Sequence, residues 1–109
     1  MERSKTAMFL VKIIKEDKPE SLENVVKAIN NVFNSIKEKK NIIDSRTYES
    51  LIQKNLQVIE DIKELLKEKD MHKCAQMFDS LIKSIENKQK TITQNLAERH
   101  DISHGMKAL

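Results

Sequence analysis

The sequence predicts an all-α protein, built as a four-helix bundle in a single domain of residues 1–109. The chain of 109 residues contains one Gly and one Pro, far fewer turn residues than a sheet protein of this length needs. Charged residues make up 34% of it, and apolar side chains recur at three- and four-residue intervals in four segments, which is the period of a helix face. Short connections predict antiparallel neighbours, and the small size favours pairing into a dimer through the first or fourth helix.

The first helix is predicted over residues 4–16, where apolar side chains cover most of the helix circumference. These side chains are Ala7, Met8, Phe9, Leu10, Val11, Ile13 and Ile14. Two interpretations are open: a central core helix buried on more than one side, which we favour, or a surface that docks on another chain or a membrane. The sequence Asp17-Lys18-Pro19-Glu20 predicts the boundary with the next helix, with Asp17 as its cap and Pro19 in its first turn.

The second helix is predicted over residues 18–40 and the third over residues 45–69, each with one apolar face. The second ends in a basic cluster, residues 37–40, followed by Asn41, which tolerates the left-handed conformation of a helix stop. The basic cluster is more typical of a solvated helix end than of a phosphate site. Asp44 is the predicted cap of the third helix.

The fourth helix is predicted over residues 71–99, with Asp70 as its cap and a short C-terminal tail after it, where Gly105 marks its end or a bend. Apolar residues recur every seven positions, and two more fill the seam between them. The seven-residue series is Met71, Phe78, Ile85 and Ile92, and the seam residues are Cys74 and Leu81. The seam then becomes polar, because Lys88 and Asn95 follow in it and Arg99 follows Ile92 in the seven-residue series.

Composition also limits the environment and the ligands. Cys74 is the only cysteine, so an internal disulfide and an all-cysteine metal site are impossible, and we expect a reducing, cytoplasmic compartment. The longest apolar run, residues 7–11, is far too short to span a membrane, so we expect no membrane partner. The net charge of +3 is too small to identify a nucleic-acid binder.

Residues 99–105 concentrate the reactive side chains of the chain. They hold one of three Arg residues, two of three His residues and the only Gly. The guanidinium of Arg99 suits a phosphodiester, and the imidazole of His100 or His104 can accept and return a proton near neutral pH. Such groups suffice for metal-free RNA cleavage, in which the ribose 2′-OH attacks the adjacent phosphate and leaves a cyclic phosphate.

Arg99, His100, His104 and Gly105 resemble the signature of HEPN domains, which are helical nucleases of toxin–antitoxin, abortive-infection and CRISPR-associated systems. In that signature a polar residue follows the Arg, a His comes after four intervening residues, and Gly often follows the His. Residues 81–98 also resemble the long helix that precedes the motif in abortive-infection C-terminal domains. The resemblance implies a helical homodimer that cleaves RNA without a metal at a site shared by both chains.

By the same resemblance, Arg99 would hold the scissile phosphate, His104 would be the general base or acid, and His100 would support the pair. Residues five apart on an unbroken helix point about 140° away from each other. Arg99 and His104 therefore need a bend or a second chain to converge.

Two other interpretations of these residues are open. His100 and His104 lie four positions apart, so on a helix they share a face and could hold a metal with Asp101 nearby. No third strong ligand is visible, and we expect neither a metal nor another cofactor. The other interpretation is a non-enzymatic helical module that binds a partner protein, as a chaperone, adaptor, immunity protein or regulatory subunit. It accounts for the apolar first helix and the seven-residue seam, and leaves open whether the protein is an enzyme.

Overall fold

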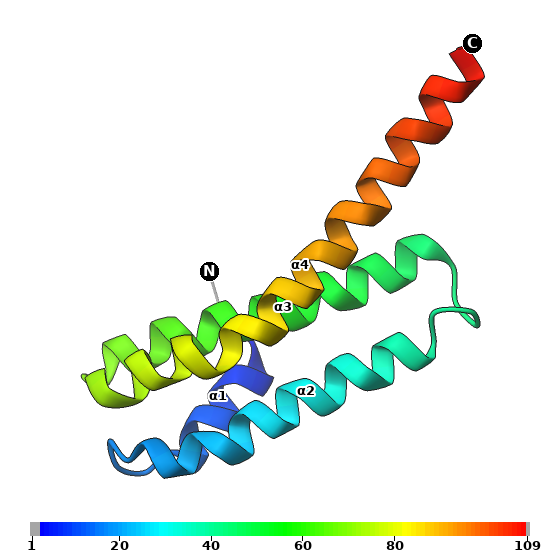
Figure 1. The fold of residues 1–109 in the computed structure, drawn as a ribbon. Coiled ribbons are helices and arrows are strands. Elements are labelled where there is room, and N and C mark those ends of the chain that lie inside the picture. The colour runs from blue at the N-terminus through cyan, green and yellow to red at the C-terminus, as the bar shows by residue number, and fades with distance from the viewer. Residues whose placement is uncertain (1–2, 109) are drawn as a thin grey trace.

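The computed structural model describes the backbone of residues 3–108 and the side chains of residues 3–94. Its helices are α1 (Lys5–Ile13), α2 (Leu22–Glu38), α3 (Ser45–Glu68) and α4 (His72–Ala108), and a 3-10 turn, η1 (Pro19–Ser21), precedes α2. Residues 3–108 contain no strand, so the predicted all-α class with four helices is confirmed. Helices α2 and α3 run antiparallel, as do α3 and α4 (Figure 1). The first helix ends at Ile13, three residues before the predicted end, and α4 continues past the predicted end at residue 99.

The larger of two hydrophobic clusters joins all four helices. It combines one face of α1 with the first half of α2, the second half of α3 and the start of α4. Its buried members are Ala7, Leu10, Val11, Ile14, Leu22, Val25, Ile29, Ile59, Ile62, Leu66, Cys74, Phe78 and Ile82. Buried apolar area of this kind is the main favourable contribution to folding, at roughly 25 cal/mol per Å².

The smaller cluster contains no residue of α1. Phe33 and Ile36 of α2 pack there against Tyr48 and Ile52 of α3, with Ile92 of α4 partly buried against them. The nine residues of α1 extend about 13 Å, whereas the 24 residues of α3 extend about 36 Å at 1.5 Å per residue. The molecule is therefore a four-helix bundle at one end and a three-helix bundle at the other.

The expectation that the first helix is buried on more than one side is wrong. Only one face of α1 packs inward, and the side chains of Met8, Phe9 and Ile13 are 40%, 66% and 42% exposed. The physical reason is position, because α1 packs against α3 and α2 and lies between them in Figure 1. No other element of the described chain covers its outer face, so the side chains there stay exposed.

Two carboxylates at helix ends act differently from the prediction. Asp17 caps α4 and not α2: its Oδ1 accepts from the Cys74 N–H at 2.8 Å and its Oδ2 from the Lys73 N–H at 3.2 Å. These hydrogen bonds, led by that from Cys74, lower the pKa of Asp17. The cap reaches across 57 residues, so sequence spacing alone could not reveal it.

Asp70 ends α3 and does not cap α4. Its φ of 57° is in the left-handed region, and the Met71 N–H donates to the Leu66 carbonyl at 2.9 Å while the Asp70 N–H donates to the Lys67 carbonyl at 3.1 Å. This pair of bonds is the Schellman motif, in which Gly usually holds the position of Asp70. Asn41 has no positive φ, so the predicted left-handed stop after the second helix is also wrong.

The prediction that Asp44 caps the third helix is confirmed. Its Oδ1 accepts from the Thr47 N–H at 2.8 Å, and this bond lowers the pKa of the carboxyl group. The seam predicted on the fourth helix is correct at Cys74 but not at Leu81, which is 42% exposed. Ile82 is buried in its place, so the buried residues Cys74, Phe78 and Ile82 follow one another at four-residue intervals.

Candidate functional site

Arg99, His100 and His104, the predicted catalytic residues, have side chains that lie outside the described residues. Their predicted roles therefore stay predictions. Within the described part of the chain, no group of three His, Cys, Asp or Glu side chains is arranged to hold a metal ion. His72, the histidine in that part, is exposed and lies 3.8 Å from Asp70. The described residues with functional potential are found at three other places in the bundle.

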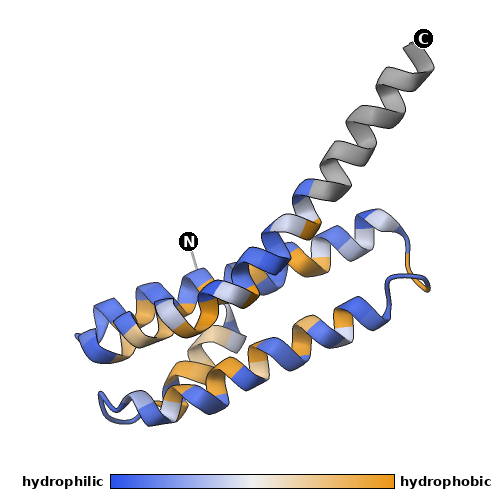
Figure 2. Ribbon diagram, viewed as in Figure 1, coloured by the Kyte–Doolittle hydropathy of each residue, from blue (hydrophilic) through white to orange (hydrophobic). Residues whose placement is uncertain are grey.

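The first place is the outer face of α1, defined by Met8, Phe9 and Ile13. These three large apolar side chains are exposed on one short helix, and α1 is hydrophobic along most of its length (Figure 2). Lys5 and Lys12 flank them and are exposed, and no Asp or Glu occurs between residues 4 and 15. The face is thus apolar and cationic.

Contacts at its N-terminal end hold α1 in position. Asp61, buried on α3, accepts from the Ser4 N–H at 2.8 Å and from the Gln57 side chain at 2.9 Å. Arg3 pairs with Glu64 at 3.2 Å and with Glu68. The outer face of α1 therefore belongs to a helix fixed on α3 and is not a loosely attached segment.

The second place is a groove of about 450 Å³ beyond the N-terminal end of α1, which we call the α2–α3 groove. Its lining comes from α2 and the residue after it, from α3 and from α1: Asn31, Val32, Ser35, Ile36, Lys39, Leu51, Lys54, Asn55, Val58 and Thr6. Its apolar lining is Val32, Ile36, Leu51 and Val58. Lys39 and Lys54 provide its charged groups, and none of its lining residues is acidic.

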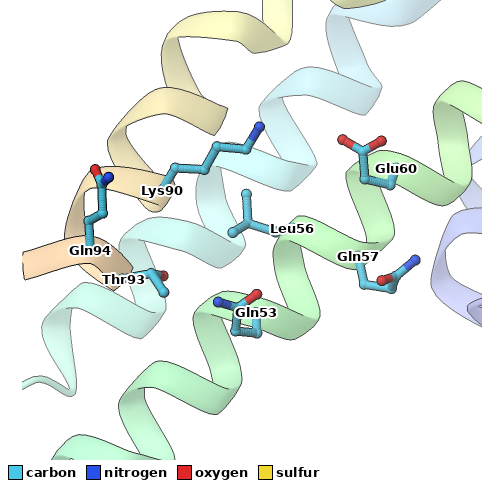
Figure 3. A pocket seen from close by; sticks show the side chains of 7 residues that line it. All are labelled: Gln53, Leu56, Gln57, Glu60, Lys90, Thr93 and Gln94. Atoms are coloured by element: carbon cyan, nitrogen blue, oxygen red, sulfur yellow. The ribbon is translucent and has the colours of Figure 1, made fainter. Parts of the chain in front are cut away.

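The third place is an open cleft of about 600 Å³ between α3 and α4. Figure 3 shows Leu56 between Gln53 and Gln57 of α3 on one side and Lys90 and Gln94 of α4 on the other. Lys90 lies 3.5 Å from Glu86, so its charge is already partly neutralised. The polar lining consists of three amides, one hydroxyl, one carboxylate and one amine: Gln53, Gln57, Gln94, Thr93, Glu60 and Lys90. These polar side chains can form hydrogen bonds with a polar ligand in the cleft.

Polar side chains are also buried inside the bundle. The Asn55 Nδ2 donates to the Gln89 Oε1 at 3.0 Å, and both side chains are nearly or fully buried. The Gln89 Nε2 is buried and has no hydrogen-bond partner among the described residues. Nearby, Lys63 lies 3.0 Å from Glu86. Burial raises the pKa of Glu86, but the hydrogen bond and charge of Lys63 outweigh it and lower that pKa overall.

The sequence analysis missed these buried polar residues. Asn55 lies three residues after the buried Ile52, and Gln89 lies seven residues after the buried Ile82, so both occupy the apolar stripes of their helices. A polar residue within an otherwise apolar stripe of a helix indicates a buried polar side chain, and the sequence shows this pattern at both positions.

No protein-family model, curated protein or solved structure matches the chain. Among the described residues, no helix has both the length and the apolar composition that crossing a membrane requires.

Proposed function

We propose that this protein is a helical protein-interaction module that binds a partner protein through the outer face of α1. The observation that supports it best is the exposure of Met8, Phe9 and Ile13 on a helix whose other apolar face is fully packed. Single exposed apolar residues are normal, but several on one short helix are typical of a binding surface. A partner that covers them gains roughly 25 cal/mol for each Å² of apolar surface removed from water.

The test is to purify the full chain with its partner from source cells, identify that partner, and reconstitute the complex from purified components. We expect Phe9→Glu to weaken binding at least tenfold in calorimetry, because a carboxylate would enter the apolar interface. Ile42→Glu is the matched control, since Ile42 is 81% exposed and lies between α2 and α3, away from α1. Equal affinity of Phe9→Glu and the parent protein would refute the proposal, as would the failure of any partner to bind after reconstitution.

We also propose a second candidate, a HEPN-like nuclease of a defence or toxin system that acts on RNA in the cytoplasm. The spacing of Arg99 and His104, with His100 and Gly105, supports it. In this candidate two copies form a homodimer, Arg99 binds the scissile phosphate, and His104 transfers the proton with His100 in support. No metal takes part.

RNA cleavage in the presence of a chelator tests the nuclease candidate. We expect the parent protein to leave cyclic phosphate ends and the double variant Arg99→Ala/His104→Ala to lose at least 100-fold in rate, in line with the loss of a general acid–base group. His72→Ala is the control, because His72 is exposed at the start of α4. No cleavage by the parent protein, or unchanged cleavage by the double variant, would exclude this candidate.

A further inference from the structure

We propose that the α2–α3 groove binds an acidic amphipathic helix of the partner protein, in the bundle position that α1 leaves open. This inference rests on the interaction function proposed above, and it specifies the chemistry of the partner. Thr6, in the first turn of α1, lines the groove together with residues of α2 and α3, so the groove begins where α1 begins. A helix bound there would lie in line with α1 and extend the four-helix packing to the other end of the bundle.

The dimensions of the groove fit two turns of helix. Its lining extends from Leu51 to Val58 on α3, which is about 10 Å at 1.5 Å per residue, or two helical turns. The facing segment, residues 31–39 at the C-terminal end of α2 and its cap, extends about 12 Å by the same measure. Amphipathic helices bind such grooves through apolar residues at positions i, i+3, i+4 and i+7, which span the same length.

The floor of the groove is apolar and partly uncovered. Val32 is 48% exposed although it lies one residue before the buried Phe33, and it shares the groove with Ile36, Leu51 and Val58. The smaller hydrophobic cluster lies beneath this floor and receives no side chain from α1. A partner helix would cover Val32 and complete the packing that α1 provides at the other end of the bundle.

The charges identify the partner helix as acidic. Lys39, directly after α2, and Lys54 of α3 are exposed groove residues, and the lining contains no carboxylate. The outer face of α1, next to the groove, adds Lys5 and Lys12. A second copy of α1 would bring lysines against lysines, whereas Glu or Asp side chains on a partner helix would pair with them. Charge complementarity therefore favours an acidic partner over self-association through this surface.

The probe for the experiment is a fluorescein-labelled 18-residue peptide with Leu at one helical face and Glu at the other positions. A second peptide has Lys at every Glu position. We expect the acidic peptide to bind the full chain in fluorescence anisotropy at low salt, and the basic peptide to bind at least tenfold more weakly. Equal binding of the two peptides, or no binding of the acidic one, would overturn the proposal.

Two pairs of variants locate the binding site. Val32→Asp should weaken binding of the acidic peptide at least tenfold, whereas Leu81→Asp, a similarly exposed position on α4, should not. The double variant Lys39→Glu/Lys54→Glu should also weaken binding of the acidic peptide at least tenfold while retaining the helical circular dichroism spectrum. Its control is Lys67→Glu/Lys69→Glu, because all four lysines are exposed. Groove variants that bind the peptide as tightly as their controls would refute the site.

Sedimentation and the reconstituted complex separate the alternatives. A dimer of the parent protein that Val32→Asp converts to monomers would overturn the proposal, because a second copy would then occupy the groove. Loss of partner binding by Phe9→Glu, with no effect of Lys39→Glu/Lys54→Glu, would refute the groove and leave the interaction function standing. No effect of either variant on partner binding would refute both.

Discussion

The buried amide pair of Asn55 and Gln89 contains one hydrogen bond and one buried amide nitrogen without a partner among the described residues. Gln89 is fully buried, its Oε1 accepts from the Asn55 Nδ2 at 3.0 Å, and its Nε2 has no partner among the described residues. An unpaired buried polar group costs about 1–3 kcal/mol, and a typical internal hydrogen bond contributes about 0.5–1.5 kcal/mol. The two partners should therefore respond to substitution in opposite directions.

Gln89→Met removes both amide atoms and keeps a side chain of similar length. The unpaired Nε2 disappears, and Asn55 loses its bond to Gln89 but lines the α2–α3 groove, where water can replace it. We expect an increase of about 1 kcal/mol in the free energy of unfolding. Asn55→Ala instead leaves both polar atoms of Gln89 without a partner, and we expect a decrease of about 2–3 kcal/mol.

Urea denaturation followed by circular dichroism at 222 nm measures both changes. A difference of about 3–4 kcal/mol between the variants corresponds to roughly 12–32 °C in melting temperature, at about 4–8 °C per kcal/mol for a domain of this size. The double variant should be nearly as stable as Gln89→Met, because the cost of Asn55→Ala arises mainly at Gln89. Additive effects in this cycle, or a Gln89→Met protein less stable than its parent, would refute the reasoning.

Four further predictions concern charged groups and the single thiol. Asp70→Gly should raise the free energy of unfolding by about 0.5–1 kcal/mol in urea titration, because Gly avoids the left-handed penalty at φ 57° but loses more chain entropy; a decrease would contradict the Schellman assignment. Glu86→Gln should lower the free energy of unfolding by about 1–2 kcal/mol at pH 7, because the partly buried Lys63 loses its closest partner. In the parent protein, a pH titration should show this contribution disappearing as the pH falls through the lowered pKa of Glu86. Burial, followed by the nearby Asp17 carboxylate, raises the pKa of the Cys74 thiol to about 11. Reaction with a disulfide reagent at pH 8 should therefore be at least 100-fold slower in the native protein than in urea, and a native rate equal to the unfolded rate would show that the helix start opens freely. Because the pKa of Asp17 is lowered, its cap should stabilise α4 fully above the ordinary pKa of 3.8 and lose this effect as the pH falls through the folded pKa. The melting temperature of Asp17→Asn should therefore fall less in acid than that of the parent protein. An equal fall in both proteins would argue against the cap.

Much of the fold was predictable because helix periodicity and local caps are properties of neighbouring residues. The third helix was expected over residues 45–69 and is found as Ser45–Glu68, with Asp44 as its cap. The second and fourth helices begin within four residues of the prediction. These features depend on interactions over three or four residues, which the sequence displays directly.

Features that depend on distant residues were not predictable in the same way. Asp17 was expected to cap the helix beside it, and it caps α4, whose N-terminus the bundle brings within 2.8 Å of its carboxylate. The roles predicted for Arg99, His100 and His104 stay predictions, because their side chains lie outside the described residues. The exposed apolar face of α1 likewise depends on which side of α1 packs against the bundle.

The sequence by itself determined that this chain forms helices, roughly where they begin and end, and that the first of them is apolar nearly all round. The tertiary structure decided which of those apolar side chains are buried. Ala7 and Val11 face the bundle and Phe9 faces solvent, although all three belong to the same apolar segment. The physical reason is that hydrophobicity has no direction: it favours burial of every apolar side chain, and only the positions of α2 and α3 determine which face of α1 is covered.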